Sequence, residues 1–189
     1  MNCSGQTRAC ARALCAILLG AAGLAAALEF DSRPSAGTMA QTADRIVVAR
    51  CVDSAPRADA KTGSIFTYSK FEVLESVKGR VGPAFTIRLF GGTVGNITDG
   101  APGLPEFHQG EKVVLFLGPD NQDGYPALFL QGVYRTEQEP ASGAWIVTDP
   151  IDDLPLFRAG TRTPISITRL SEPPITVEDF VYSIRQALR

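Results

Sequence analysis

The sequence predicts a mainly β protein, a small closed or partly open antiparallel β-barrel with one helix at its C-terminal end. Six or seven short apolar or alternating segments are separated by turns rich in glycine and proline. The last segment instead has the spacing of an amphipathic helix. The chain is 44% hydrophobic and 20% charged, which is an ordinary globular composition. A β-sandwich is the alternative, because the pairing order of the strands cannot be read from these segments.

Residues 1–27 have the features of a secretory signal peptide. Arg8 and Arg12 form a positive n-region, an uncharged apolar run extends over Ala13–Ala27, and its last three alanines suit signal peptidase. The run is shorter than the roughly twenty residues that span a bilayer, which favours a signal over an N-terminal anchor. We therefore expect cleavage near Ala27, a secreted or periplasmic location, and no membrane-spanning segment in the mature chain.

Cleavage would change both the charge and the cysteine content. Without Arg8 and Arg12 the chain carries 16 Lys and Arg against 20 Asp and Glu, a net charge of −4. A mildly acidic chain without a basic block is not expected to bind nucleic acid or an anionic membrane surface. Cys51 is the one cysteine after residue 27, so no intrachain disulfide is expected. Its place in an apolar run predicts a buried strand residue rather than a reactive thiol or an intermolecular bridge.

The first half of the barrel domain, which we predict over residues 28–149, begins with a short helix. The helical spacing of its alanines places this helix over Ser35–Ala43. A β-branched run predicts the first strand over Ile46–Val52, and the sequence DSAPRADAKTG predicts a loop. The second strand, Ser64–Val77, is apolar in patches on both faces, so we expect a bend or a β-bulge near Ser69.

The second half of this domain is expected to supply the remaining strands. Phe85, Ile87 and Leu89 alternate with polar residues and predict a half-buried strand. The run Val113–Leu117 is apolar without alternation, which is typical of a central strand covered on both faces. An Asp-Gly pair at 123–124 predicts a hairpin turn into Leu128–Tyr134, and a turn around Gly143 leads to Trp145–Thr148.

The tail is expected to differ from the barrel. Residues 150–174 contain scattered prolines and predict an irregular segment, and residues 175–189 predict an amphipathic helix that docks on the sheet. Thr176 is the expected N-cap, with Glu178 and Asp179 in the first turn. One apolar stripe is formed by Val177, Phe180, Val181, Ile184 and Leu188.

Residue types argue against most catalytic and metal sites. His108 is the single histidine, and we expect it to be a solvated loop residue. A catalytic pair with Cys51 is disfavoured because Cys51 lies in mid-strand. Zinc sites need more His or Cys ligands than the mature chain offers. We therefore expect no catalytic residue, no metal and no cofactor.

Carboxylates leave two other readings open. A structural calcium ion could use Asp149, Asp152 and Asp153, or the turn at 120–123, although solvated turns are the preferred reading of both. An oxygen-only hydrolase site that adds Glu111 to the same three aspartates is the alternative function to a binding protein. A structural, envelope-associated role is a further alternative.

The segment LFGGTVGN, Leu89–Asn96, raises the question of a phosphate-binding loop. Its glycines fit neither GxGxxG nor GxxxxGK[ST], and Pro102 and Pro105 oppose a helix directly after it. The glycines instead predict a sharp bend or bulge where the strand leaves the barrel. At least one of Gly91, Gly92 and Gly95 should therefore have positive φ, and no helix should begin before Pro102.

The long loop that we expect from Gly91 to Gly110 is the predicted surface for an unknown protein partner, because long loops in compact domains are usually functional or disordered. The two glycines at 91 and 92 open this loop, and exposed side chains are expected at its other candidate positions. The candidate binding residues are Gly91, Gly92, Thr93, Asn96, Asp99, Leu104, Phe107 and His108.

Four segments occur together in an order that resembles a known group of proteins: ADRIVVARCV, FTYSKFEVLESVKG, FTIRLFGGTVGN and GLPEFHQGEKVVLFL. Over about Asp44–Tyr134 the chain resembles secreted bacterial proteins that look like the OB-fold barrel of the netrin-like domain, which tissue inhibitors of metalloproteinases also use. The resemblance implies a small OB-like barrel and a rigid scaffold that presents loops to a partner.

The resemblance to the inhibitors is incomplete. They carry an N-terminal Cys-x-Cys that reaches the protease zinc, whereas the mature chain would begin near Leu28-Glu29. No inhibitory residue can therefore be transferred to this sequence. The sequence thus predicts an exported, non-enzymatic binding module, and a secreted metalloprotease as its partner is a narrower hypothesis.

Overall fold

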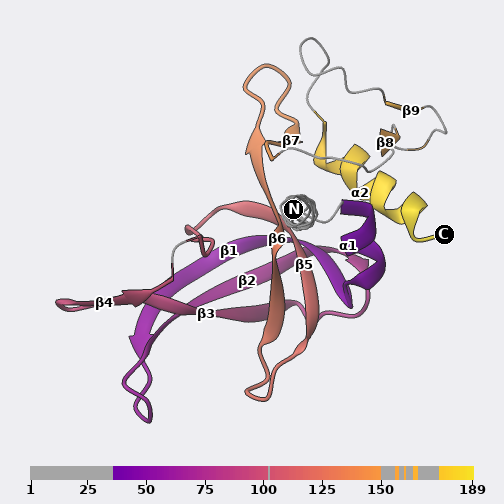
Figure 1. Cartoon of the computed structure of the whole chain (residues 1–189). Helices are drawn as coiled ribbons and strands as arrows, with labels where there is room; N and C mark the ends of the chain where they lie inside the picture. The colour runs from indigo at the N-terminus through magenta and orange to yellow at the C-terminus, as the bar shows by residue number, and fades with distance from the viewer. Residues whose placement is uncertain (1–35, 102, 150–155, 158–159, 161–163, 166–174) are drawn as a thin grey trace, which may run out of the picture. The chain divides into compact units, whose positions relative to one another are not determined.

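A computed structural model describes residues 36–101, 103–149, 156–157, 160, 164–165 and 175–189. Most of these residues form one antiparallel sheet that curls into half a barrel, with a C-terminal helix in contact with it (Figure 1). The predicted signal peptide and most of the irregular segment at 150–174 lie outside the described residues. Within the described part of the chain, no helix is long and apolar enough to cross a membrane.

The elements confirm the mainly β prediction. Within the described ranges, seven strands belong to the curled sheet, and two short strands pair with each other. In chain order the elements are α1 (Ala36–Thr42), β1 (Arg45–Ala58), β2 (Ile65–Lys78), β3 (Ala84–Val94), β4 (Ile97–Gly100), β5 (Lys112–Asp120), β6 (Pro126–Gln138), β7 (Trp145–Val147), β8 (Leu156–Phe157), β9 (Pro164–Ile165) and α2 (Val177–Ala187).

The strand order contains a Greek key. In the main sheet the order is β4-β3-β2-β1-β5-β6-β7, and all neighbours are antiparallel. Three strands, β1 to β3, are joined by hairpins, and the later strand β5 returns to lie beside β1. The resulting order β5-β1-β2-β3 is the arrangement that defines a Greek key. A single curled sheet of this kind matches the predicted barrel rather than the sandwich.

The central strands β1 and β5 are covered on both faces, which confirms the expectation for Val113–Leu117. All five of these β5 side chains are fully buried, and successive ones enter opposite cores. The helix-side core lies under α1 and α2, and the barrel core fills the concave side of the sheet. The two strands contribute Ile46, Val48, Val114 and Phe116 to the helix-side core, and Val47, Ala49, Cys51, Val113, Leu115 and Leu117 to the barrel core.

The first strand is longer than predicted. Residues Asp53–Ala58, which we expected to be a loop, pair with β2. Pro56 lies opposite Thr67 in this part of β1, where β5 no longer pairs with it, because the β1–β5 ladder covers only Arg45–Arg50. A proline is tolerated there because it lies beside a free edge and no ladder hydrogen bond needs its missing N–H.

Irregular pairing between β1 and β2 bends the sheet. Their register shifts between Ile46 and Val47, between Val48 and Ala49, and between Cys51 and Asp53. The last shift lies opposite Lys70 and Phe71, so the irregularity expected near Ser69 is present, with the extra residue on β1. Bulges of this kind increase twist and bend a strand, which accounts for the curl of the sheet.

The C-terminal helix begins as predicted. Thr176 is the N-cap, and its Oγ1 accepts a hydrogen bond of 3.0 Å from the backbone N–H of Asp179. The apolar stripe packs on the helix-side core, where four of its five members are buried and Leu188 is partly buried. The same core includes Met39 of α1, so both helices cover the same face of the sheet.

Candidate functional site

The predicted loop from Gly91 to Gly110 is only partly a loop. β3 continues through Val94, and a tight turn at Gly95 and Asn96 leads into β4, which pairs with the end of β3. We expected no regular element after the glycines, and that expectation is wrong for Ile97–Gly100. The hairpin extends from the body of the sheet (Figure 1). Residues 91–101, all of which the structure describes, contain no helix, as predicted.

Close approaches of the backbone explain the two adjacent glycines. The φ angles of Gly91 and Gly92 are 108° and 132°, and Gly95 also has positive φ, which confirms the prediction for this segment. A Cβ at Gly91 would lie 2.7 Å from the Cα of Gly100, and one at Gly92 would lie 2.6 Å from the Cβ of Pro56. Gly91 therefore lets the end of β3 lie close to β4, and Gly92 lets the hairpin lie directly against β1 and β2.

The loop after β4 is tied to the barrel core. Phe107 is 5% exposed, and its ring meets that of Phe71 edge to face, with 5.0 Å between the ring centroids. Its burial is contrary to our expectation of an exposed side chain. Two backbone hydrogen bonds of 2.8 Å continue the loop along β1, from Gly110 N to Cys51 O and from Cys51 N to Glu111 O. The chain around Phe107 is thus fixed by packing and pairing.

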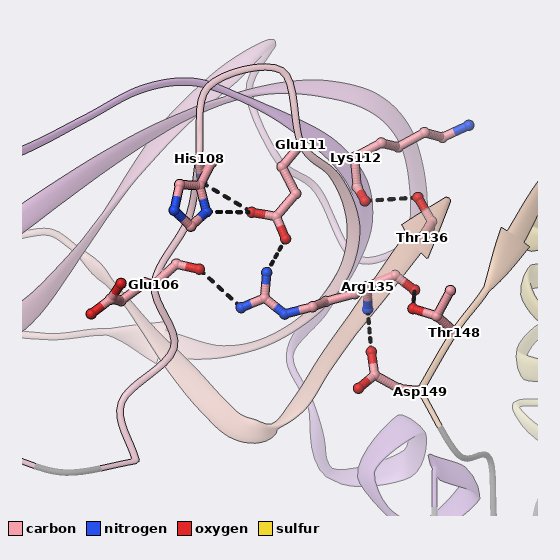
Figure 2. Close-up of polar contacts among 8 residues, drawn as sticks. All are labelled: Glu106, His108, Glu111, Lys112, Arg135, Thr136, Thr148 and Asp149. Atoms are coloured by element: carbon pink, nitrogen blue, oxygen red, sulfur yellow. Dashed lines mark hydrogen bonds and ion pairs between the residues drawn. The ribbon is translucent and has the colours of Figure 1, made fainter. Parts of the chain in front are cut away.

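A partly buried ion pair holds the same loop to β6 (Figure 2). Arg135 Nη1 donates to Glu111 Oε1, and Arg135 Nη2 donates to the carbonyl oxygen of Glu106 at 2.9 Å. The second carboxylate oxygen of Glu111 accepts a 3.0 Å hydrogen bond from the backbone N–H of His108. On the far side of Arg135, its backbone N–H donates to the Asp149 carboxylate. Sequence reasoning did not identify Arg135, because nothing in the pattern of β6 distinguishes it.

A pocket of about 340 Å³ lies between the hairpin and this loop, at the open end of the barrel core. One wall comes from β3 and β4, and the other comes from residues 101 and 104–108. Residues of β1 and β2 complete the lining, which includes Ser54, Pro56, Thr67, Leu89, Phe90, Gly91, Gly92, Thr93, Asp99, Gly100, Ala101, Leu104, Pro105, Glu106, Phe107 and His108. The mouths of β-barrels are common positions for binding sites.

Most of the predicted binding residues come together at this pocket. Its lining contains Gly91, Gly92, Thr93, Asp99, Leu104, Phe107 and His108. Asn96 lies instead in the exposed hairpin turn, outside the lining. Sequence reasoning did not identify Ser54, Pro56 and Thr67, because composition predicts a loop at Asp53–Ala58 and no local pattern shows that the hairpin lies against β1 and β2.

Cys51 is buried and His108 is exposed, as the sequence predicts. Cys51 is fully buried, and burial raises the pKa of its thiol, whose Sγ lies 3.5 Å from the carbonyl oxygen of Asp53. The side chain of His108 is 79% exposed, as predicted. The Nδ1 atom of His108 lies 4.0 Å from the Glu111 carboxylate. Among the described contacts, neither His108 nor Glu111 forms a hydrogen bond with a serine hydroxyl.

The carboxylates proposed for other chemistry have structural partners. Glu111 and Asp149 both bind Arg135, and Asp152 and Asp153 lie outside the described residues. In the turn at 120–123, Asp120 pairs with Arg45 at 2.5 Å and Asp123 pairs with Arg88 at 2.6 Å. Among the described residues, no group of three or more His, Cys, Asp or Glu is placed to hold a metal ion.

Comparison of the chain with known protein families, with curated protein sequences and with solved structures gives no significant match.

Proposed function

We propose that this protein is an exported, non-enzymatic binding module that holds a protein partner at the pocket between the β3–β4 hairpin and residues 104–108. The proposal includes an OB-like barrel of the netrin-like type, because such a barrel is a five-stranded, partly open Greek key. Strands β1, β2, β3, β5 and β6 supply five strands in a Greek-key order, and the sheet is open between β3 and β6. Export rests on the features of residues 1–27.

The observation that carries this proposal is the construction of the pocket. Its hairpin wall depends on Gly91 and Gly92, and its loop wall is anchored by Phe107 and by the pair of Glu111 and Arg135. Preformed walls reduce the entropy that is lost when a partner binds. The thiol of Cys51 and the carboxylate of Glu111, by contrast, are engaged in packing and pairing, which favours binding over catalysis.

The test is capture of a partner with a variant in which the pocket is blocked. Ala101 lines the pocket and is exposed. The indole ring of Ala101→Trp should therefore cover the opening of the pocket from the solvent side and leave the packing of the core unchanged. Ala141 is also exposed, in the turn between β6 and β7, and Ala141→Trp is the matched control. The chain is expressed from residue 1 and used to retain proteins from its native envelope fraction.

We expect the parent chain and Ala141→Trp to retain the same protein, and Ala101→Trp to lose it. Equal melting temperatures of the three proteins would show that the loss is local. Retention that is unchanged in Ala101→Trp would overturn the proposed site. The same experiment with a candidate secreted metalloprotease, read as inhibition of peptide hydrolysis, tests the narrower hypothesis.

A further inference from the structure

We propose that the pocket accepts a cationic side chain, Lys or Arg, from an extended partner segment that lies along β4. This inference rests on the proposed function and specifies its partner. Three features of the hairpin and the pocket support it: the charges of the lining, the apolar residues beside it, and the free edge of β4.

The charged side chains that line the pocket are acidic. Among its described lining residues the charged side chains are those of Asp99 and Glu106, and none is Lys or Arg. The guanidinium of Arg135 on β6, which contacts the loop wall, is engaged by Glu111 and by the carbonyl oxygen of Glu106. Figure 2 shows the carboxylate of Glu106 pointing away from Arg135. Its charge therefore remains available to a ligand of opposite sign.

Two exposed apolar side chains lie on the same face of the hairpin as Asp99. Val94 is directly opposite Ile97, and Gly92 is directly opposite Asp99. Every second residue of a strand points to the same face, so Ile97 and Asp99 project together. Ile97 is 68% exposed and Val94 is 37% exposed, although aliphatic side chains gain free energy when they are covered.

The outer edge of β4 has no strand beside it among the described residues, since β4 is the first strand in the order of the sheet. Alternate residues of an edge strand turn their N–H and C=O groups outward, and an extended peptide can pair with them. In an antiparallel pairing, the partner residue opposite Asp99 precedes the one opposite Ile97 by two positions. The partner motif is therefore Lys or Arg, any residue, then an aliphatic residue.

The experiment uses two blocked pentapeptides that differ in one residue, Thr-Lys-Thr-Val-Thr and Thr-Glu-Thr-Val-Thr. Each is added to the isotope-labelled protein, expressed from residue 1, and backbone amide signals are followed by NMR. We expect the Lys peptide to shift the signals of residues 97–101 and 106–108 with a dissociation constant in the range of about 1 mM. Raising the salt concentration should weaken this binding several-fold. We expect no such shifts with the Glu peptide.

Removal of the two negative charges should abolish the preference. We expect Asp99→Asn with Glu106→Gln to weaken binding of the Lys peptide at least about tenfold. The asparagine can still accept the 3.0 Å hydrogen bond that Asp99 Oδ1 receives from Gly100 N. The control combines Asp44→Asn with Glu137→Gln, two exposed carboxylates outside the pocket lining, and should bind as the parent does.

Three results would overturn this inference: equal shifts with both peptides, no shifts with either at roughly ten times the expected dissociation constant, or full binding by the doubly neutralised variant. Failure of the inference can be distinguished from failure of the proposed function. If the pocket-blocking Ala101→Trp loses the native partner but the neutralised variant retains it, the site stands and its cationic ligand does not.

Discussion

Arg135 on β6 joins the two ends of one loop, because its Nη2 donates to the carbonyl oxygen of Glu106 and its Nη1 donates to the carboxylate of Glu111. The loop between these residues forms one wall of the pocket and contains Phe107 and His108. This guanidinium therefore acts together with the packing of Phe107 and the backbone pairing with Cys51 to position the wall. The consequences of removing this contact can be measured.

We expect Glu111→Gln to lower the free energy of unfolding by about 1–2 kcal/mol. The side chain of Glu111 is 15% exposed and that of Arg135 is 40% exposed, so the pair is partly buried, and neutralisation of Glu111 leaves the Arg135 charge without its carboxylate partner. Urea unfolding measures the change in stability. Hydrogen exchange of the backbone amides should report faster local opening in residues 106–111, while exchange in β5 follows global stability.

A surface pair provides the control for this prediction. Arg50 and Glu72 lie 2.9 Å apart, and their side chains are 46% and 43% exposed. Glu72→Gln should therefore change the free energy of unfolding by less than about 0.5 kcal/mol. Equal effects of the two substitutions would contradict a special role of the Arg135 contact.

We expect Gly92→Ala to destabilise the protein by at least about 2 kcal/mol. An added Cβ would lie 2.6 Å from Pro56 Cβ and 2.7 Å from Thr67 Oγ1, and φ is 132°. Gly103 also has positive φ, but no atom lies within 4 Å of an added Cβ. Gly103→Ala should therefore cost only the backbone strain of about 1–2 kcal/mol. Thermal unfolding of the two variants separates strain from steric overlap, and equal losses would show that crowding at Gly92 is relieved without cost.

We expect Thr176→Ala to lower stability by about 1 kcal/mol, because the first turn of α2 loses the acceptor for Asp179 N–H. Thr176→Ser keeps a hydroxyl at the same place and should recover most of the loss. The comparison isolates the cap from the backbone bridge that Thr176 makes with Ile146, which both variants retain. If serine and alanine destabilise equally, the hydroxyl does not supply the stabilisation.

Periodicity predicted the elements that bury a face. The stripe of α2 and the uninterrupted apolar run of β5 occupy the positions expected of them, because burial of those side chains dominates the choice of structure. Periodicity did not predict the strands at Asp53–Ala58 and Ile97–Gly100, because these segments become strands only by pairing with an adjacent strand. Local composition indicated a loop at both segments, yet β2 and the end of β3 provide the hydrogen bonds that make them strands.

The site was predicted by segment rather than by geometry. Glycine spacing disfavours a phosphate loop and indicates instead the residues that follow β3. The position of Phe107 in the barrel core depends on Phe71, which lies 36 residues earlier in the chain. The role of Arg135 on β6 depends likewise on Glu111, which directly precedes β5. Contacts between such distant segments leave no spacing pattern in a single sequence.

The buried thiol of Cys51 predicts a loss of stability at alkaline pH. Burial raises the thiol pKa above the ordinary value of 9.0, so the unfolded chain ionises first as the pH increases. The stability that comes from keeping the thiol neutral is fully present below pH 9.0 and is lost as the pH rises through the raised pKa. Cys51→Ala removes this dependence, although its smaller side chain lowers stability at every pH.

The measurement is the free energy of unfolding of the parent and of Cys51→Ala across about pH 8 to 10.5. Tyrosines and lysines titrate in the same range and affect both proteins alike, so the difference between the two curves reports the thiol. We expect this difference to decrease by up to about 1.4 kcal/mol for each pH unit above the ordinary thiol pKa. Parallel curves would show that the native thiol ionises as readily as the unfolded one, and would contradict its burial in the barrel core.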